Sequence, residues 1–441
     1  MLSLLVIIRV FSMHIKTTTH EHYALSEITK PYAATVTLHI TADCYSENSP
    51  ARTALLLLYP DLILSGSGLY SREEFQHKLD ELGSSITISE SEGRISITMA
   101  ALAEKLKPTL QLLEILLTKP TFKASEQKRA TQTLKNSLEL FKENARGIAL
   151  SALRNSLFSN ESRHFDVPPA DVEKALTGLS TLQLKQIHAE FMNAYWTISV
   201  GGNEASLMVV LSALKKLKTA SVLTLIDKEI VLGTEKTSRQ VLLHEVKSKQ
   251  NIELSIGGHM PLTFTDSDLP AFLFGLAVLG KWGGFAGRLM STVREKEGLT
   301  YTIYARADGI TTSEVGYWRI LTFFAPKDVV QGVTSTLREI ESIVDKGITK
   351  SEFERFKTIL KTGETLVFDS LNNTTALVHT NLVYGLQWEQ YKAFRQAFQT
   401  VTQKEINAAL RKYLNPQALV ISAAGPIATV QKDLSAFARK K

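Results

Sequence analysis

Cysteine is almost absent from this sequence, since Cys44 is the only one in 441 residues. A single thiol excludes a disulfide within the chain and any zinc site built from several cysteines. No histidine or basic cluster stands beside it in the sequence, so an activated thiol is not indicated. We expect Cys44 to be a small buried hydrophobic residue.

The sequence also lacks a hydrophobic run long enough to cross a membrane. The apolar stretch Leu2 to Ile8 is far short of the roughly 20 residues that a spanning helix needs. No charge precedes it and no small-residue cleavage pattern follows, as a secretory signal would require. We expect residues 1–25 to form an N-terminal tail, with Met13 as an alternative start. A cytoplasmic protein without a membrane partner is the expectation, and export is the alternative if this stretch acts as a signal.

Long basic runs are missing too, although the net charge is +6 and the pI is near 9.1. Lysine and arginine are scattered along the chain rather than grouped, which is typical of a solvated basic surface. We therefore expect no nucleic-acid partner.

Histidines with the spacing of a helical metal site are the most informative absence. None of the ten histidines has another four residues away, and the zinc motif His-x-x-Glu-His does not occur. His20 and His22 would share one face of a strand, but no third ligand stands near them. We expect this chain to bind no catalytic zinc.

An internal repeat is what the sequence does contain. A strand pattern at 94–100 precedes two helix patterns, and the same order recurs after a second strand pattern at 317–324. Each half closes with a further strand, at 196–200 and at 418–422. The period of about 220 residues is far above that of solenoid repeats and indicates two homologous domains.

The predicted fold class is α+β, with a mostly antiparallel sheet and helices packed on one face in each domain. We expect an N-terminal domain at 26–212, a linker at 213–236 and a C-terminal domain at 237–441. Local signals agree: Ser71 and Glu74 predict a capping box that opens a helix.

The densest set of special residues lies in the second half. A glycine-rich segment at 280–289 is followed by Arg-Glu-Lys-Glu-Gly-Leu-Thr-Tyr at 294–301. This order predicts a turn, a helix that Gly298 ends, and a strand that holds Tyr301. Arg294 and Tyr301 would then be aimed from rigid elements at one point. The alternative is that Arg294 pairs with Glu295 or Glu297, and that Tyr301 packs in the sheet.

This segment resembles the C-terminal half of the pitrilysin/insulinase-type (M16) zinc peptidases, and the resemblance covers about residues 30 to 425. It implies the two-domain fold of that family, which is also called LuxS/MPP-like. In the family the matching Arg and Tyr hold the scissile peptide. The resemblance therefore implies that Arg294 and Tyr301 position substrate and stabilise the oxyanion. It also suggests a substrate-binding loop at Gly283, Gly284 and Gly287.

The same resemblance locates the residues that stand where the family has its zinc ligands. Leu57, Pro60 and Asp61 occupy the His, Glu and His positions, and Ser137 corresponds to the distal Glu. Only Asp61 could bind a metal, and one carboxylate does not replace three protein ligands. Pro60 moreover disfavours a continuous helix by about 3 kcal/mol.

The resemblance therefore implies a zinc-less subunit of a heterodimeric metallopeptidase, like the non-catalytic subunit of processing peptidases. A homologous zinc-bearing partner would supply the metal, and unfolded peptides would be the substrates. The alternative is a structural or peptide-binding subunit without a part in catalysis. The chain is not expected to be active alone.

Overall fold

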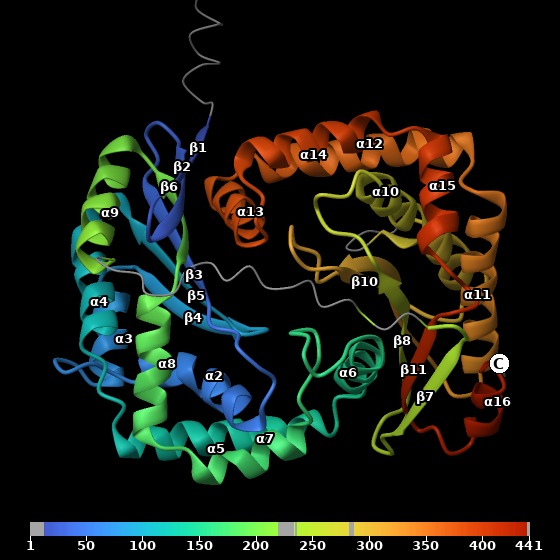
Figure 1. Cartoon of the computed structure of the whole chain (residues 1–441), viewed down its shortest axis with the longest axis horizontal. Coiled ribbons are helices and arrows are strands. Elements are labelled where there is room, and N and C mark those ends of the chain that lie inside the picture. Colours follow the sequence, from blue (N-terminus) through green and yellow to red (C-terminus); the bar gives the residue numbers. More distant parts are fainter. Residues whose placement is uncertain (1–12, 219–232, 234–235, 282–285, 439–441) are drawn as a thin grey trace, which may run out of the picture. The chain divides into compact units, whose positions relative to one another are not determined.

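The computed structural model describes residues 13–218, 233, 236–281 and 286–438 (Figure 1). Their contacts divide the chain into two compact units that interleave in sequence. Residues 137–166, from the first half, group with the second sheet, and residues 364–389 group with the first. The units thus differ from the contiguous ranges that we expected, because each half of the chain contributes a helix to the other half's sheet.

The first unit is built on a mostly antiparallel sheet. Within the described residues it has six strands in the order β1-β2-β6-β3-β5-β4, of which β2 and β6 are the parallel pair. The strands are β1 (His14–Thr19), β2 (Tyr23–Thr29), β3 (Thr35–Asp43), β4 (Ser85–Ser91), β5 (Arg94–Leu102) and β6 (Trp196–Gly202). The expected N-terminal tail is corrected here, because β1 pairs with β2 along its whole length and residues 14–19 are part of the sheet.

The second unit repeats this topology. Its described strands run in the order β7-β11-β8-β10-β9, with β7 and β11 parallel. They are β7 (Gln240–Glu245), β8 (Ile252–Met260), β9 (Ile303–Asp308), β10 (Gly316–Phe324) and β11 (Val420–Gly425). The order matches β2-β6-β3-β5-β4 strand for strand, so the repeat in the sequence is also a repeat in topology.

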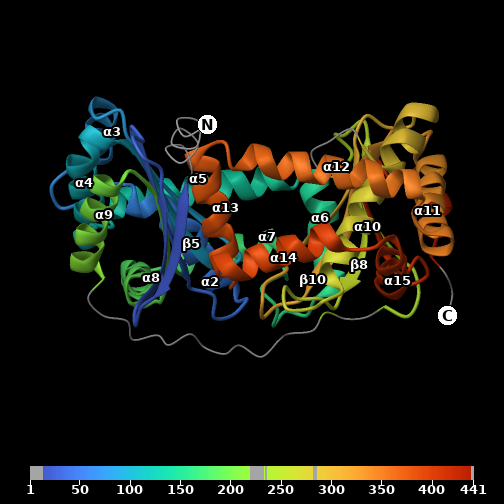
Figure 2. The same ribbon diagram turned by 90° about the horizontal axis from the view of Figure 1, so that it is seen from above.

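Alternation along β3 gives the first sheet one apolar and one hydroxyl-rich face. Val36 and Ile40 are fully buried on one face, while Thr37 and Thr41 point to the other. Among the helices of the first half, α4 (Leu106–Thr118) and α9 (Glu204–Leu217) lie on the apolar side, and α13 (Leu371–Val383) lies on the opposite side (Figure 2). The other helices of this unit are α2 (Pro50–Ile63), α3 (Arg72–Glu81), α7 (Pro169–Ala175) and α8 (Thr181–Asn193), with the short turns η1 (Ala103–Lys105) and η2 (Leu176–Gly178).

Close approach of α13 to the sheet depends on a glycine. A Cβ at Gly201 of β6 would lie 2.2 Å from the Thr375 hydroxyl oxygen. The bare backbone lets α13 lie directly on the hydroxyl-rich face, where Asn372 accepts a hydrogen bond from Thr37.

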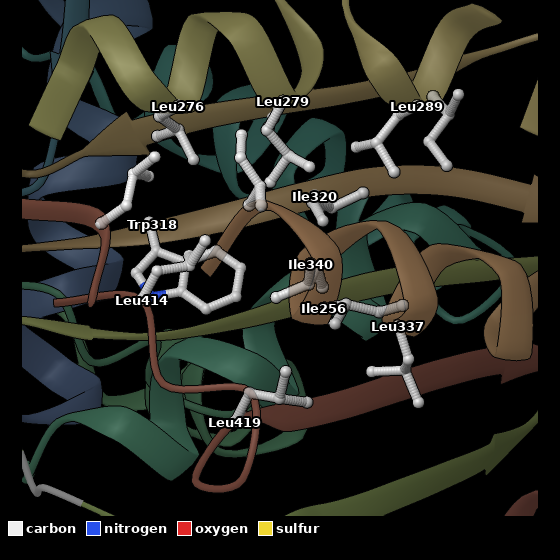
Figure 3. Close-up of a cluster of buried hydrophobic side chains, with 14 of the residues drawn as sticks. Ile256, Leu276, Leu279, Leu289, Trp318, Ile320, Leu337, Ile340, Leu414 and Leu419 are labelled. Atoms are coloured by element: carbon white, nitrogen blue, oxygen red, sulfur yellow. The ribbon is translucent and has the colours of Figure 1, made fainter. Parts of the chain in front are cut away.

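The core of the second unit lies between its sheet and its own helices. Trp318 and Ile320 of β10 and Ile256 of β8 pack under Leu276 and Leu279 (Figure 3). Burial of each such side chain stabilises the fold by about 1.5–3 kcal/mol. The helices over this face are α10 (Leu269–Gly280), α11 (Val329–Lys346), α15 (Gln403–Tyr413) and the short α16 (Gln431–Ser435).

The other face of the second sheet is covered by α6 (Ala145–Leu157), which comes from the first half of the sequence. Its Leu153 and Leu157 pack with Tyr317 and Val420. Three long helices contain the boundaries between the units: α5 (Ala124–Phe141), α12 (Lys350–Val367) and α14 (Trp388–Thr400).

The local signals of the sequence are confirmed. Glu74 N–H donates to Ser71 Oγ at 3.3 Å, and Ser71 N–H donates to Glu74 Oε2 at 2.7 Å, which completes the capping box of α3. Among the described helices, none is both long and apolar enough to cross a membrane.

Candidate functional site

Helix α2 contains the three positions at which the resemblance places zinc ligands. It runs without interruption from Pro50 to Ile63, although Pro60 lies inside it. Our expectation that Pro60 damages the helix is wrong. The proline removes one backbone hydrogen bond, but its neighbours Leu58, Tyr59 and Leu62 are buried and hold the segment in place. Leu57 and Asp61, at positions i and i+4, therefore lie on one face of an intact helix.

Asp61, at the last of these positions, belongs to an ion-pair network. Arg129 donates from Nη2 to Asp61 Oδ2 at 2.5 Å, and Arg72 donates from Nη1 to Asp61 Oδ1 at 3.1 Å. Both guanidinium groups also donate to Glu126 Oε2, at 3.0 Å from Arg72 and 3.1 Å from Arg129. The network joins α2, α3 and α5 through two positive and two negative groups.

The charges of this network stabilise one another. Partial burial disfavours the charged form of Glu126, but hydrogen bonds from Arg129 and Arg72 outweigh this and lower the pKa of that carboxyl. For Arg129 too, the hydrogen bonds with Glu126 and Asp61 outweigh burial and raise the pKa. Two guanidinium groups thus bring positive charge to the carboxylate of Asp61.

Leu57 and Ser137 are further residues that the resemblance aligns with zinc-site positions. Leu57 is a partly exposed apolar side chain on α2. Ser137 lies on α5 just beyond the boundary, in the second unit. His20 and His22 occupy the turn between β1 and β2, and His20 Nε2 lies 3.1 Å from Thr18 Oγ1. Within the described ranges, no three His, Cys, Asp or Glu side chains are grouped as they would be around a metal ion.

Arg294 lies on the expected helix, η3 (Met290–Lys296), which is a π-helix. The last backbone hydrogen bonds of this helix span more residues than the four of an α-helix. Glu297 N–H donates to Thr292 O at 3.0 Å, and Leu299 N–H donates to Val293 O at 3.1 Å. Gly298 ends the helix with a φ of 65°, as its position in the sequence predicted. π-Helical turns are rare and occur often at functional sites.

Tyr301 precedes β9 instead of lying on it, so our prediction of a strand position is wrong. The residues from 299 to 302 form the connection between η3 and the strand that begins at Ile303. The Tyr301 side chain is 67% exposed, so it does not pack in the sheet. The connection places Tyr301 beside the π-helix, and its ring is available to solvent.

Arg294 and Tyr301 are brought together as the sequence predicted. The Arg294 guanidinium lies over the Tyr301 ring, with its Cζ atom 4.7 Å from the ring centre. Such a cation–π contact contributes about 0.5–1 kcal/mol at an exposed site. The stacking restrains both side chains, so a guanidinium and a phenol hydroxyl are presented from one small area of the second unit.

The glycine-rich segment is described in part. Gly287 has a φ of 116°, and a Cβ there would lie 2.8 Å from Gly280 Cα and 3.0 Å from Leu279 O. Gly287 thus allows the chain to pass directly against the end of α10. Gly283 and Gly284 lie outside the described residues.

A stacked pair of histidines, His39 and His379, was not predicted from the sequence. His379 of α13 stacks on His39 of β3, with ring centres 5.2 Å apart. Its Nε2 lies 2.8 Å from Thr41 Oγ1, and its Nδ1 lies 3.2 Å from Ser199 Oγ. Burial lowers the pKa of His39 to about 4 and, with the neighbouring ring of His39, that of His379 to about 3. No local signal could have found a pair 340 residues apart in the chain.

Comparisons with known proteins show which proteins this chain is similar to. A family model described as peptidase M16 inactive domain matches residues 199–360. This part of the chain is similar to that domain. A non-peptidase homolog of Helicobacter pylori, YmxG, is 21% identical over 369 residues, which is 81% of each chain. An uncharacterized zinc protease of Mycobacterium tuberculosis is 31% identical over 134 residues, which is 30% of each chain.

The M16 fold extends over nearly the whole chain. A peptidase M16 inactive domain from Pseudomonas fluorescens matches with a TM-score of 0.80 at 20% identity, and covers 94% of this chain and 98% of its own. A protease from Helicobacter pylori matches with a TM-score of 0.80 at 13% identity, and covers 94% of this chain and 100% of its own. The predicted fold class is confirmed, and the sequence lacks the zinc motif His-x-x-Glu-His.

Proposed function

We propose that this chain is the zinc-less subunit of a heterodimeric M16-type metallopeptidase. The observation that carries the proposal is a contrast within one molecule. Asp61, which the resemblance aligns with a zinc ligand, is held in an ion-pair network, whereas Arg294 stacks on Tyr301, whose side chain is 67% exposed.

In this proposal the chain contributes hydrogen-bond donors to peptide hydrolysis. The carbonyl oxygen of the scissile bond gains negative charge in the transition state, and fixed donors lower the barrier. Loss of one such donor typically costs about 3 kcal/mol. The Arg294 guanidinium would bind and orient the carbonyl, and the Tyr301 hydroxyl would donate to the developing oxyanion. The zinc of the partner subunit would activate the attacking water.

The substrate class follows from the same chemistry. Both donors would bind a backbone carbonyl oxygen, which is accessible in an extended segment whose backbone is not already hydrogen-bonded. We therefore propose that the substrates are unfolded peptides held by strand addition. The chain itself is proposed to hold no metal. Zinc content of the purified chain, measured by mass spectrometry, tests this point, and stoichiometric zinc would contradict it.

A second candidate is a structural or peptide-binding subunit. The relative of Helicobacter pylori that aligns over 81% of this chain bears the name non-peptidase homolog, which favours this alternative. In that case neither Arg294 nor Tyr301 would influence hydrolysis by any partner.

One experiment separates the two candidates. Cleavage of an unstructured fluorogenic peptide is measured with this chain, with a homologous subunit that carries His-x-x-Glu-His, and with both. The split-site proposal expects activity only in the mixture, reduced roughly a hundredfold by Tyr301→Phe or Arg294→Ala. Arg355→Ala, an exposed arginine of α12, is the matched control and should have no effect. Equal activity of the mixtures with wild type and variants would support the scaffold instead.

A further inference from the structure

The π-helix that carries Arg294 is fastened at both ends to the hairpin of α11 and α12. Arg288, just before η3, and Glu297, just after it, each bond to that hairpin. We name these contacts the Arg288 clamp (Arg288, Gly347, Glu352) and the Glu297 clamp (Glu297, Ser335, Arg338). Both lie within the second unit.

The Arg288 clamp is a bidentate ion pair with an additional carbonyl contact. Arg288 donates from Nε to Glu352 Oε1 at 2.6 Å and from Nη2 to Glu352 Oε2 at 2.8 Å. Its Nη2 also donates to Gly347 O at 2.7 Å, at the end of α11. The arginine side chain is 13% exposed, so solvent screens this pair only partly. The clamp therefore joins the start of the π-helix to both helices of the hairpin.

The Glu297 clamp holds the other end of the π-helix. Arg338 donates from Nη2 to Glu297 Oε1 at 2.5 Å, and the Ser335 hydroxyl donates to Glu297 Oε2. Partial burial disfavours the Glu297 charge, but these hydrogen bonds outweigh it and lower the pKa of the carboxyl. Both oxygens of the carboxylate are thus occupied by residues of α11, and Glu297 is fixed three residues after Arg294.

Helix α11 is a rigid base for these contacts. Val333, Leu337 and Ile340 on its inner face are buried in the core of the second unit. The π-helix itself has wide hydrogen bonds, and the four residues that lead to β9 form no regular structure. Without external contacts, this segment would hold the long Arg294 side chain and the exposed Tyr301 poorly.

We propose that Glu297 and Arg288 are positioning residues that keep Arg294 and Tyr301 stacked in the geometry needed by a substrate carbonyl. That this geometry serves a substrate carbonyl rests on the proposed function. The positions of the Arg294 and Tyr301 side chains, in contrast, can be measured without an activity assay. A misplacement of about 1 Å can reduce a rate roughly a hundredfold, so loss of a clamp should act mainly on kcat.

The test uses the full chain with 3-fluorotyrosine introduced at position 301 and read by fluorine NMR. Arg294→Ala defines the signal of the unstacked ring. We expect Glu297→Gln and Arg288→Gln to move the resonance at least halfway toward that signal. The matched controls Glu354→Gln and Arg355→Gln, exposed residues of α12, should leave it unchanged. Far-ultraviolet circular dichroism and thermal unfolding show whether each variant is folded.

A charge swap shows whether the shift of the resonance comes from loss of the ion pair or from a general change in structure. Glu297→Arg combined with Arg338→Glu restores the ion pair with reversed polarity, and should return the resonance toward that of the wild type. A wild-type resonance in both Glu297→Gln and Arg288→Gln would overturn the proposal. So would a shift that the swap leaves in place.

Activity then separates this inference from the function on which it rests. In the mixture with a zinc-bearing subunit, we expect Glu297→Gln to lower kcat about tenfold and to change KM less than about threefold. If the resonance moves but no mixture shows activity that depends on Arg294, the positioning stands and the proposed function fails. If the mixture is active, and Glu297→Gln changes neither kcat nor the fluorine resonance of residue 301, the positioning role of Glu297 is refuted while the proposed function stands.

Discussion

Acidification should destabilise the first unit through the stacked histidines His39 and His379. A histidine in an unfolded chain titrates near pH 6.5. In the folded chain, burial lowers the pKa of His39 to about 4, and burial with the ring of His39 lowers that of His379 to about 3. Below pH 6.5 the unfolded state therefore binds more protons than the folded state, so stability falls as the pH falls.

The magnitude follows from the difference between the folded and unfolded pKa values. One pKa unit corresponds to about 1.4 kcal/mol, and pH 5 lies about 1.5 units below the unfolded value. Each ring then costs about 2 kcal/mol at pH 5, and the pair costs at most about 4 kcal/mol relative to pH 8. The loss is complete only when the pH falls below the folded values, near 3 to 4.

The assay is urea unfolding at pH 8 and at pH 5, followed by tryptophan fluorescence. We compare the wild type with His39→Gln/His379→Gln, in which amides replace the titrating rings. The double variant should lose less stability between the two pH values, by about 3–4 kcal/mol. His188 and His244, whose pKa values are also lowered by burial, contribute equally to both proteins and cancel.

His77→Gln is the matched control, since His77 on α3 is exposed and faces Glu81. It should change the pH dependence by less than about 0.5 kcal/mol. An identical loss of stability in the wild type and the double variant would refute the reasoning, because it would show that the rings titrate alike in both states.

Three further predictions concern stability, and each is measured by urea unfolding at neutral pH. Arg129→Ala should lower the free energy of unfolding by about 1 kcal/mol, because it removes partly exposed ion pairs with Asp61 and Glu126; no change would show that solvent screens them fully. Pro60→Ala should raise the free energy of unfolding by about 1 kcal/mol, because α2 regains a backbone hydrogen bond. This gain should exceed the conformational entropy that the unfolded chain gains without the proline. A lower free energy of unfolding would indicate that the proline ring is needed for packing. Gly287→Ala should lower the free energy of unfolding by at least about 2 kcal/mol, because the φ is 116° and the added Cβ would lie 2.8 Å from Gly280 Cα; a neutral result would mean that the turn can move away from α10.

Features that depend on neighbouring residues could be predicted from the sequence. Strand and helix periodicity located β5, β10, α4 and α11, since alternation and helical spacing are local properties. The capping box of Ser71 and the stop at Gly298 follow from contacts within a few residues. The expectation that Arg294 and Tyr301 are aimed at one point is local too, because the two residues lie seven positions apart in the sequence.

The site was predicted less well wherever distant segments meet. The resemblance aligned Asp61 with a zinc ligand, but nothing in the sequence indicated its partners Arg72 and Arg129, which come from two other helices. Each clamp of the π-helix likewise joins residues at least 38 positions apart. Charged residues are common on any surface, so their type alone does not indicate which of them will pair.

The sequence by itself determined that the chain contains two similar halves, which elements each half forms, and that the usual zinc ligands are missing. Only the tertiary structure decided that α6 and α13 cover the sheets of the opposite halves, that α2 continues through Pro60, and that His39 meets His379. The physical reason is the range of the forces involved. Backbone geometry and side-chain periodicity act between near neighbours, whereas the packing of a helix on a sheet depends on surfaces that the chain assembles from distant segments.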